Sequence, residues 1–168
     1  MKNCQYNIFR TQWGWFGLLG NEQGVIRTCL PVANKEAVQG RLLSGFPDAE
    51  QSTTAFSILK KRILAYYEGS AEDFRDVAVC LEDRSEFQQK ILSILRTVSY
   101  AETVSYRQLA QLAGNPKAAR AIGSVMAQNP LPLIIPCHRV IKSDGTIGQF
   151  SAPGGTNAKK RMLQLEKS

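Results

Sequence analysis

The most constraining feature of this sequence is an apolar stretch near its C-terminal end, fenced by three prolines. Residues 130–140 read PLPLIIPCHRV, and their apolar side chains are typical of a buried segment. Near its end stand Cys137 and His138, the latter being the only histidine of the chain. We interpret the segment as a strand, along which neighbouring side chains point to opposite faces. Adjacency in sequence therefore does not by itself put the thiol in contact with the imidazole.

The net positive charge of the chain comes entirely from its second half. The 168 residues suffice for one domain or two small ones, and 43% hydrophobic and 21% charged residues are ordinary for a globular protein. Residues 1–84 hold ten Lys/Arg and ten Asp/Glu, whereas residues 85–168 hold eleven Lys/Arg and four Asp/Glu. The asymmetry favours an anionic partner for the second half, above all nucleic acid. Charge alone, however, more often marks a solvated basic surface.

Several classes of protein are disfavoured by the sequence. No apolar run reaches the length of a membrane span, and residues 1–19 lack the zones of a signal peptide. We therefore expect an intracellular protein, cytoplasmic or, in a eukaryote, nuclear, with no membrane partner. Cys4, Cys29, Cys80 and Cys137 form no C-x-x-C pair, and one histidine cannot complete a regular zinc motif. We expect free thiols and no metal.

The first half predicts a small antiparallel sheet with helices. Residues 5–10, 14–19 and 24–30 are strand-like and separated by Gly and Asn. Asn34 can cap a short helix that ends at Leu43, and a longer helix is expected over about 54–68. The acidic, irregular residues 69–83 are the candidate linker. We therefore predict an N-terminal domain over residues 1–80.

The second half predicts a mostly helical domain over residues 85–168. Ser85 and Ser105 each begin a capping box, with Gln88 and Gln108 three residues on. Gly114 should end the second of these helices, Asn115 should cap the next, which runs to about Ala127, and the two helices form a helix–turn–helix. A short hairpin around 142–145 and a last helix capped by Thr156 complete an α/β (α+β) fold.

The second helix of the pair has a surface suited to DNA. Its exposed side is predicted to consist of small residues around Arg120, which would let the helix backbone approach DNA closely. The residues concerned are Lys117, Ala118, Ala119, Arg120 and Gly123. The alternative is that the alanines mark helix packing and Arg120 is an ordinary surface charge.

Cys137 needs activation to act as a nucleophile, since a free thiol is only slightly ionised at neutral pH. His138 could accept its proton through a water or across a turn, and Glu166 could orient the imidazole. A Cys-His pair alone is weak evidence for catalysis. Its combination with a helix–turn–helix and a basic C-terminal helix is much more specific.

Several segments resemble one family in register. Residues 135–140, IPCHRV, resemble the active-site signature of the O6-alkylguanine-DNA alkyltransferases, also called methylated-DNA–protein-cysteine methyltransferases. Residues 104–110, residues 114–123 and Asn129-Pro130 resemble the DNA-binding helices and hinge of that family, and residues 163–166 its last helix. The resemblance covers about residues 86–166. The N-terminal part fits the variable domain of the family only in length and element order.

The resemblance implies a single-use DNA repair protein that needs no cofactor and acts as a monomer. Its partner would be double-stranded DNA containing O6-alkylguanine, with O4-alkylthymine left open as a second substrate. The helix–turn–helix would enter the minor groove, and the damaged base would be flipped into a pocket. Cys137 would take the alkyl group by displacement at carbon and remain alkylated.

The resemblance also assigns roles to single residues. Arg120 matches an arginine that fills the space vacated by the flipped base, and Tyr106 a tyrosine that promotes its rotation. Glu166, His138 and a water would carry the thiol proton away. Asn129 would fix the turn between recognition helix and active-site segment.

The remaining implied residues surround the base. Lys159 matches a lysine near the active cysteine, and backbone groups of Cys137, Val140 and Ser151 would hold the guanine. Phe150 replaces a tyrosine found in many members, and a phenyl ring cannot donate a hydrogen bond to the leaving guanine. The Ala152-Pro153 pair reads as a small insertion relative to shorter members, which leaves the range of accepted alkyl groups open.

Two other functions fit part of the sequence. A module that recognises alkylated DNA without repairing it would need no activated thiol, so the combination of Cys137, His138 and Glu166 argues against it. A transcription factor that reads the major groove should carry polar base-reading side chains on its recognition helix. The Ala and Gly residues of this helix argue against that function.

Overall fold

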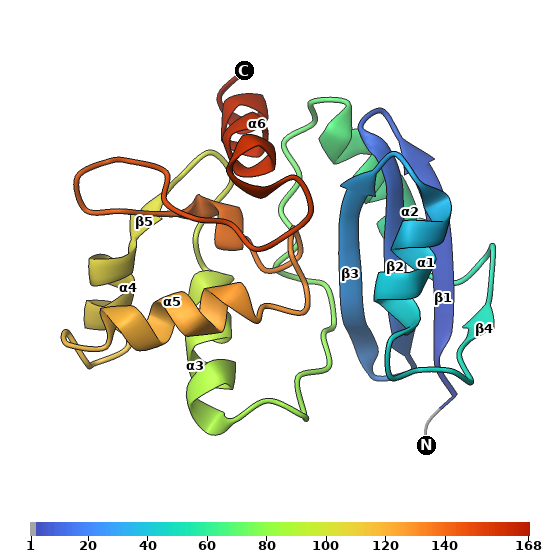
Figure 1. Cartoon of the computed structure of the whole chain (residues 1–168), viewed down its shortest axis with the longest axis horizontal. Helices are drawn as coiled ribbons and strands as arrows, with labels where there is room; N and C mark the ends of the chain where they lie inside the picture. Colours follow the sequence, from blue (N-terminus) through green and yellow to red (C-terminus); the bar gives the residue numbers. More distant parts are fainter. Residues whose placement is uncertain (1–2) are drawn as a thin grey trace. The chain divides into compact units, whose positions relative to one another are not determined.

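The computed structural model describes residues 3–168, so the first two residues of the predicted N-terminal domain lie outside it. The chain forms two compact units, one ending at Cys80 and the other spanning Leu81–Ser168 (Figure 1). No helix in the described range is long and apolar enough to cross a membrane. The structure confirms the mixed α+β fold class, and each unit is described in turn.

The N-terminal unit is built on a four-stranded sheet. Its elements are β1 (Gln5–Thr11), β2 (Gly14–Asn21), β3 (Gly24–Val32), α1 (Lys35–Leu43), β4 (Glu50–Gln51) and α2 (Ser57–Tyr67). The strand order is β3-β2-β1-β4, in which β1, β2 and β3 are antiparallel neighbours and β4 is parallel to β1. The predicted meander is therefore confirmed, each strand extending one or two residues beyond the expected end.

Successive side chains along the strands point to opposite faces of the sheet, and apolar side chains lie on both faces. Helix α1 packs on one of them over a cluster that includes Tyr6, Leu19 and Val38. Gly17 permits this close packing, since a Cβ at that position would lie 2.7 Å from Cγ1 of Val38. On the other side Phe16 contacts Tyr67 of α2, with ring centroids 6.1 Å apart. Both layers form one core around the sheet.

The first of the predicted N-terminal helices is confirmed, and the second begins later than expected. Asn34 caps α1, its side chain accepting a hydrogen bond from the Ala37 N–H at 3.1 Å. Helix α2 starts at Ser57, not near residue 54, because Phe56 adopts a left-handed conformation with φ of 60°. Beyond α2, residues 69–83 contain no helix or strand except an isolated bridge between Val25 and Val79.

The described C-terminal unit contains four α-helices, one 3-10 helix and a two-stranded parallel ladder. Its elements are α3 (Glu86–Leu95), β5 (Val104–Ser105), α4 (Tyr106–Leu112), α5 (Ala119–Ala127), the 3-10 helix η1 (Cys137–Arg139), β6 (Val140–Ile141) and α6 (Gly155–Lys167). Helices α3, α4 and α5 contact one another, and Ile91, Leu109 and Ile122 are fully buried among them. Residues 131–140 are buried throughout.

Local capping decides where these helices begin and end. Ser85 and Ser105 both form the predicted capping boxes, with Gln88 and Gln108 closing them. Gly114 follows the end of α4 in a left-handed conformation with φ of 79°, as expected of a glycine at a helix C-terminus. The predicted start of α5 at Asn115 is wrong. Residues 115–118 form a turn in which the Ala118 N–H donates to the Asn115 carbonyl, so the helix begins at Ala119.

Three further local predictions are corrected by the structure. Cys137–Arg139 form a 3-10 turn instead of a strand. The turn at 142–145 exists, with the Lys142 N–H donating to the Thr146 carbonyl, but residues 147–150 form no strand, and β6 pairs in parallel with β5 instead of closing a hairpin. Helix α6 begins at Gly155 after left-handed Gly154, so Thr156 lies inside it and is not its cap.

Candidate active site

Cys137 is placed by the apolar segment that precedes it. Asn129 spans this segment: its Nδ2 donates to the Ile135 carbonyl at 3.0 Å, and its Oδ1 accepts from the Leu131 N–H at 3.0 Å. Leu133, between these two points, holds a left-handed φ of 78°, which is costly for a non-glycine residue and persists only where its surroundings impose it. Asn129 therefore fixes the tight turn that leads into Cys137.

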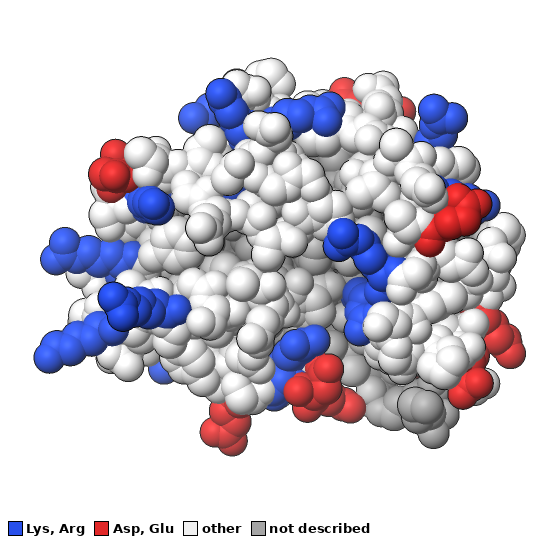
Figure 2. All heavy atoms as spheres, in the orientation of Figure 1, with Lys and Arg blue, Asp and Glu red and all other residues white. Residues whose placement is uncertain are grey.

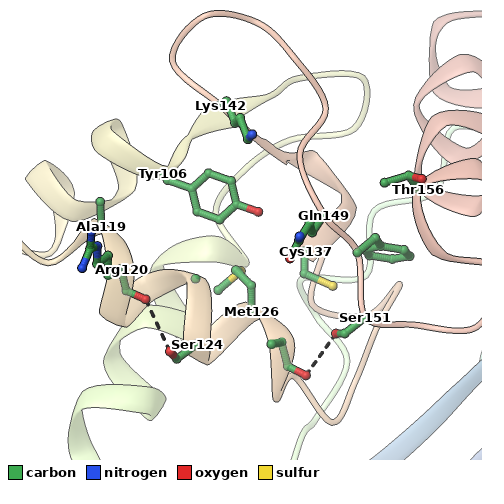
Figure 3. A pocket seen from close by; sticks show the side chains of 13 residues that line it. Tyr106, Ala119, Arg120, Ser124, Met126, Cys137, Lys142, Gln149, Ser151 and Thr156 are labelled. Atoms are coloured by element: carbon green, nitrogen blue, oxygen red, sulfur yellow. Dashed lines mark hydrogen bonds between the residues drawn. The ribbon is translucent and has the colours of Figure 1, made fainter.

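Cys137 lies at the floor of a pocket of about 780 Å³. The lining residues come from the start of α4, from α5, from η1, from the loop between β6 and α6 and from the first turn of α6: Tyr106, Ala119, Arg120, Gly123, Ser124, Met126, Ala127, Cys137, Lys142, Gln149, Phe150, Ser151 and Thr156. In Figure 3, Tyr106, Met126 and Cys137 point into the same space, and Arg120 lies farther out on α5. Cys137 as a whole is 6% exposed, and it lines this pocket.

The loop between β6 and α6 closes the pocket opposite α5. The Ser151 hydroxyl donates to the Ala127 carbonyl at the end of α5 at 3.0 Å (Figure 3). This bond uses one of the carbonyls that the last turn of a helix leaves without a partner. The loop is thus tied to the helix across the opening.

His138, the neighbour of Cys137 in the chain, forms a buried pair with Glu166. Nε2 of His138 lies 2.8 Å from Oε1 of Glu166, and the two residues are 0% and 3% exposed. Burial lowers the pKa of His138, and the Glu166 carboxylate opposes this only in part. Nδ1 of His138 is also buried and has no hydrogen-bond partner in the described part of the chain. A neutral imidazole with its proton on Nε2 keeps Nδ1 as an acceptor.

Glu166 is also held by Arg139, a residue that the sequence reading missed. Burial alone would raise the pKa of Glu166, but hydrogen bonds from His138 and Arg139 outweigh it and lower the pKa to about 2. Arg139 stands directly after the Cys-His pair in the signature, and this position was the available signal. Its partner could not be read from local spacing, since 27 residues separate them.

Lys159 brings a buried cation close to the pocket. Its side chain is fully buried, Nζ donates to the Gln149 carbonyl at 3.4 Å, and Nζ lies 5.9 Å from the ring centres of both Tyr106 and Phe150. Burial lowers the pKa of Lys159 to about 8, against the attraction of Cys137. Burial also raises the pKa of Cys137, despite the opposing effects of Asn129 and Lys159. The resting thiol is therefore protonated at neutral pH.

Not all predicted site residues reach the pocket. Lys117 is exposed in the turn before α5, and Ala118 is buried at 8% exposure, so neither lines it. Val140 is fully buried, and its N–H donates to the Cys137 carbonyl. The pocket also contains residues that were not predicted to belong to the site: Ser124, Met126, Ala127, Lys142, Gln149 and Thr156. Their placement depends on how the loop folds over α5.

Basic side chains surround the outer end of α4 and α5. The exposed basic residues of these helices and the adjoining turns are Arg107, Lys117, Arg120 and Lys142. Figure 2 shows Lys and Arg side chains projecting from this end of the C-terminal unit, on the left of the view. The pocket thus opens beside a positive surface.

The chain matches known proteins over both its C-terminal unit and its whole length. Residues 86–168 match the family model described as the DNA-binding domain of 6-O-methylguanine DNA methyltransferase. A mouse methylated-DNA–protein-cysteine methyltransferase is 57% identical over 79 residues, which are 47% of this chain and 37% of the mouse protein. The chain thus spans well under two thirds of that relative. The Mycobacterium bovis protein of the same name is 41% identical over 114 residues, 68% of this chain and 67% of the relative.

A solved structure extends the similarity to both units. The crystal structure of Mycobacterium tuberculosis O6-methylguanine methyltransferase has a TM-score of 0.80 and 31% identity, covering 98% of this chain and 93% of that chain. A structure of the mycobacterial protein in complex with DNA gives a TM-score of 0.81 at 31% identity, with 97% and 92% covered. This chain belongs to the methylated-DNA–protein-cysteine methyltransferase family.

Proposed function

We propose that this protein repairs DNA by transferring the alkyl group of O6-alkylguanine to Cys137, once per molecule. The observation that carries the proposal is that Cys137 lines the pocket and is followed directly in the chain by His138, whose imidazole is paired with the buried Glu166. A site that only recognised the lesion would need neither a nucleophile nor a proton acceptor.

The transfer is a displacement at the alkyl carbon. A bond forms from Sγ to this carbon while the bond from the carbon to O6 of guanine breaks, and guanine is restored. The thiol proton leaves to Nδ1 of His138 through a bridging water, the guanine anion takes up one proton from solvent, and His138 later returns its extra proton to solvent, so that no net proton is gained or lost. Because burial raises the pKa of Cys137, the resting thiol carries a proton that must be removed for transfer to occur. The thioether product has no leaving group, so the protein is spent.

The pocket requires an extrahelical base. A thiol at the floor of a pocket cannot reach O6 of a guanine stacked inside a duplex, so the nucleotide must rotate out of the helix. We assign to Arg120, which is exposed and lines the pocket, the role of occupying the vacated space in the stack. We assign to Tyr106, which also lines the pocket, the role of crowding the rotating nucleotide. Phe150 and Ser151 line the wall that would face the flipped base.

The surface of α5 is suited to close approach by DNA. A Cβ added at Gly123 would meet nothing within 4 Å, so packing inside the protein does not require a glycine there. A flat helix face lets a nucleic acid backbone come near. Lys117, Arg120 and the other exposed basic residues would contact phosphates. The mycobacterial relative solved with DNA supports this partner.

Mass spectrometry of the protein mixed with a duplex containing O6-methylguanine tests the proposal. We expect the peptide that carries Cys137 to gain the mass of one CH2 group, in a yield of one per molecule. Cys137→Ala should gain no mass and still bind the duplex, and Cys80→Ala, which removes a thiol outside the pocket, should react as the wild type does. A duplex containing O4-methylthymine tests the second substrate.

The possible outcomes separate the two candidate functions. Lesion-specific binding without any mass change would contradict transfer and indicate a recognition module. Methylation of a cysteine other than Cys137 would remove the pocket from the mechanism.

A further inference from the structure

Arg139 donates three hydrogen-bond contacts to Glu166, which also accepts one from His138. Its Nε lies 3.2 Å from Oε1 and 3.1 Å from Oε2 of Glu166, and its Nη2 lies 2.7 Å from Oε1. Nη1 donates to the Val98 carbonyl at 2.9 Å, and the guanidinium lies 5.8 Å from the ring centre of Tyr100. Arg139 itself is 4% exposed. The side chain is therefore held on three sides.

This arrangement fixes the protonation of the carboxyl group. Arginine has only N–H donors and does not lose its proton in proteins. Both oxygens of Glu166 therefore face donors from Arg139, and a proton on either oxygen would oppose one of them. Glu166 is left with one role toward His138, that of an acceptor. The donor must then be Nε2–H of the imidazole.

We propose that Arg139 is a positioning residue for the transfer: by keeping Glu166 an acceptor, it sets the tautomer of His138 and leaves Nδ1 free to take the thiol proton. The effect on transfer rests on the proposed function, whereas the effect of Arg139 on the tautomer of His138 does not and can be measured without DNA. The buried Nδ1, with no partner in residues 3–168, is the nitrogen this tautomer makes basic.

The positive charges near the His138–Glu166 pair also disfavour a second proton on the imidazole. The groups that face His138 and Glu166 are Arg139 from η1, Lys159 from the same helix as Glu166, and Tyr100 from the segment before β5. Arg139 and Lys159 both lower the pKa of His138. Removing Arg139 therefore lets the His138–Glu166 pair take up a second proton at a higher pH. An imidazole protonated on both nitrogens has no acceptor for the thiol proton.

The single histidine of the chain makes this directly observable. In untagged protein labelled with 15N-histidine, the nitrogen spectrum contains the ring of His138 alone. Spectra would be recorded from about pH 5 to about pH 8, the range in which an unperturbed histidine titrates. The variants are Arg139→Met and Arg139→Lys. The matched controls are Arg62→Met and Arg62→Lys, which remove an arginine held by Glu72 and Asp76 in the N-terminal unit.

In the wild type we expect a neutral ring with its proton on Nε2. In Arg139→Met the pH midpoint at which the imidazole of His138 takes up its second proton should rise by about one unit or more. On the acid side of the new midpoint, the transfer rate of the variant should be about tenfold below that of the wild type at the same pH. Arg139→Lys keeps the positive charge but cannot bond both oxygens of Glu166 as the guanidinium does. Its midpoint should therefore lie between those of the wild type and of Arg139→Met. The Arg62 variants should match the wild type in both spectrum and pH profile.

A folded Arg139→Met variant with the wild-type tautomer and midpoint would overturn the proposal. If that variant does not fold, an Arg139→Lys variant with an unchanged midpoint and an unchanged acid limb of the transfer profile would do the same. Normal transfer by the wild type with an imidazole protonated on Nδ1 would remove this inference and leave the proposed function intact. The expected tautomer without any transfer would remove the function and keep the role of Arg139 in the pair.

Discussion

Nε2 of His138 and Oε1 of Glu166 lie 2.8 Å apart, although 28 residues separate them in the chain. The contact joins η1, which carries the thiol, to the last turns of α6. It is buried on both sides, so its energy depends on the charge state of Glu166. The stability of the C-terminal unit should therefore respond to acid through this one carboxyl group.

Glu166→Gln should abolish that acid response. The pKa of Glu166 is lowered from its usual 4.5 to about 2, so its stabilisation is complete above about pH 4.5 and is lost as the pH falls toward 2. The shift corresponds to roughly 3 kcal/mol. At neutral pH the variant leaves Arg139 without its buried counter-charge, which costs about 3–5 kcal/mol. Urea unfolding at several pH values measures both effects.

The control for this experiment is Glu102→Gln, which changes an exposed acid of the same unit. Its unfolding free energy should follow that of the wild type at every pH. If the Glu166→Gln curve ran parallel to the wild-type curve between about pH 5 and about pH 2.5, Glu166 would not be the source of the acid response.

Lys159→Met should change stability at alkaline pH. Burial lowers the pKa of Lys159 from 10.5 to about 8, so between these values the unfolded chain binds more protons than the folded one. The free energy of unfolding of the wild type therefore receives from Lys159 a contribution that rises with pH across that window. The variant should be more stable than the wild type at pH 7 and should lack the rise. Lys160→Met, an exposed neighbour on α6, should show neither effect.

Arg120→Ala should reduce repair of duplex DNA more than reaction with the free base. Arg120 lies at the rim of the pocket and does not contact the thiol, so it can act on a rotated nucleotide but not on the chemistry (Figure 3). We expect about a tenfold loss on the duplex, or about 1.4 kcal/mol, and a nearly unchanged rate with O6-methylguanine as free base. Arg10→Ala, which changes an exposed arginine of the N-terminal unit, is the control. Equal losses on both substrates would exclude the proposed role.

Phe150→Tyr should keep or raise the rate of transfer. The ring of Phe150 lines the pocket with its centre 5.9 Å from Nζ of Lys159, and a hydroxyl group would add a donor beside the leaving guanine. Single-turnover kinetics of methyl transfer measure the change. A large drop would show instead that the wall of the pocket is built around the phenyl edge.

Features set by neighbouring residues were predictable from the sequence. The capping boxes at Ser85 and Ser105 depend on side chains three residues away, and the structure confirms both. The N-terminal strands follow from alternation and glycine-bearing turns. The thiol and its imidazole could be named because they stand in one hexapeptide signature.

What the sequence reading missed depends on the tertiary structure. Asn115 and Pro116 carry the local signature of a helix start, but a turn ending at Ala118 delays α5. The turn that places His138 beside Glu166 arises because Asn129 ties both ends of the apolar segment. The hydrogen bonds between Arg139 and Glu166 join residues that lie 27 positions apart, so no short sequence motif predicts them.

The two-residue ladder between β5 and β6 has a structural consequence of its own. It pairs Val104 with Val140 and Ser105 with Ile141, so it holds the start of α4, where Tyr106 stands, against the chain just after Cys137. The chain between Ser105 and Val140, which includes α5, is thus held together at both of its ends. Substitutions on the outer side of α5 are therefore expected to leave the spacing between the start of α4 and the segment after Cys137 unchanged, because the ladder sets it.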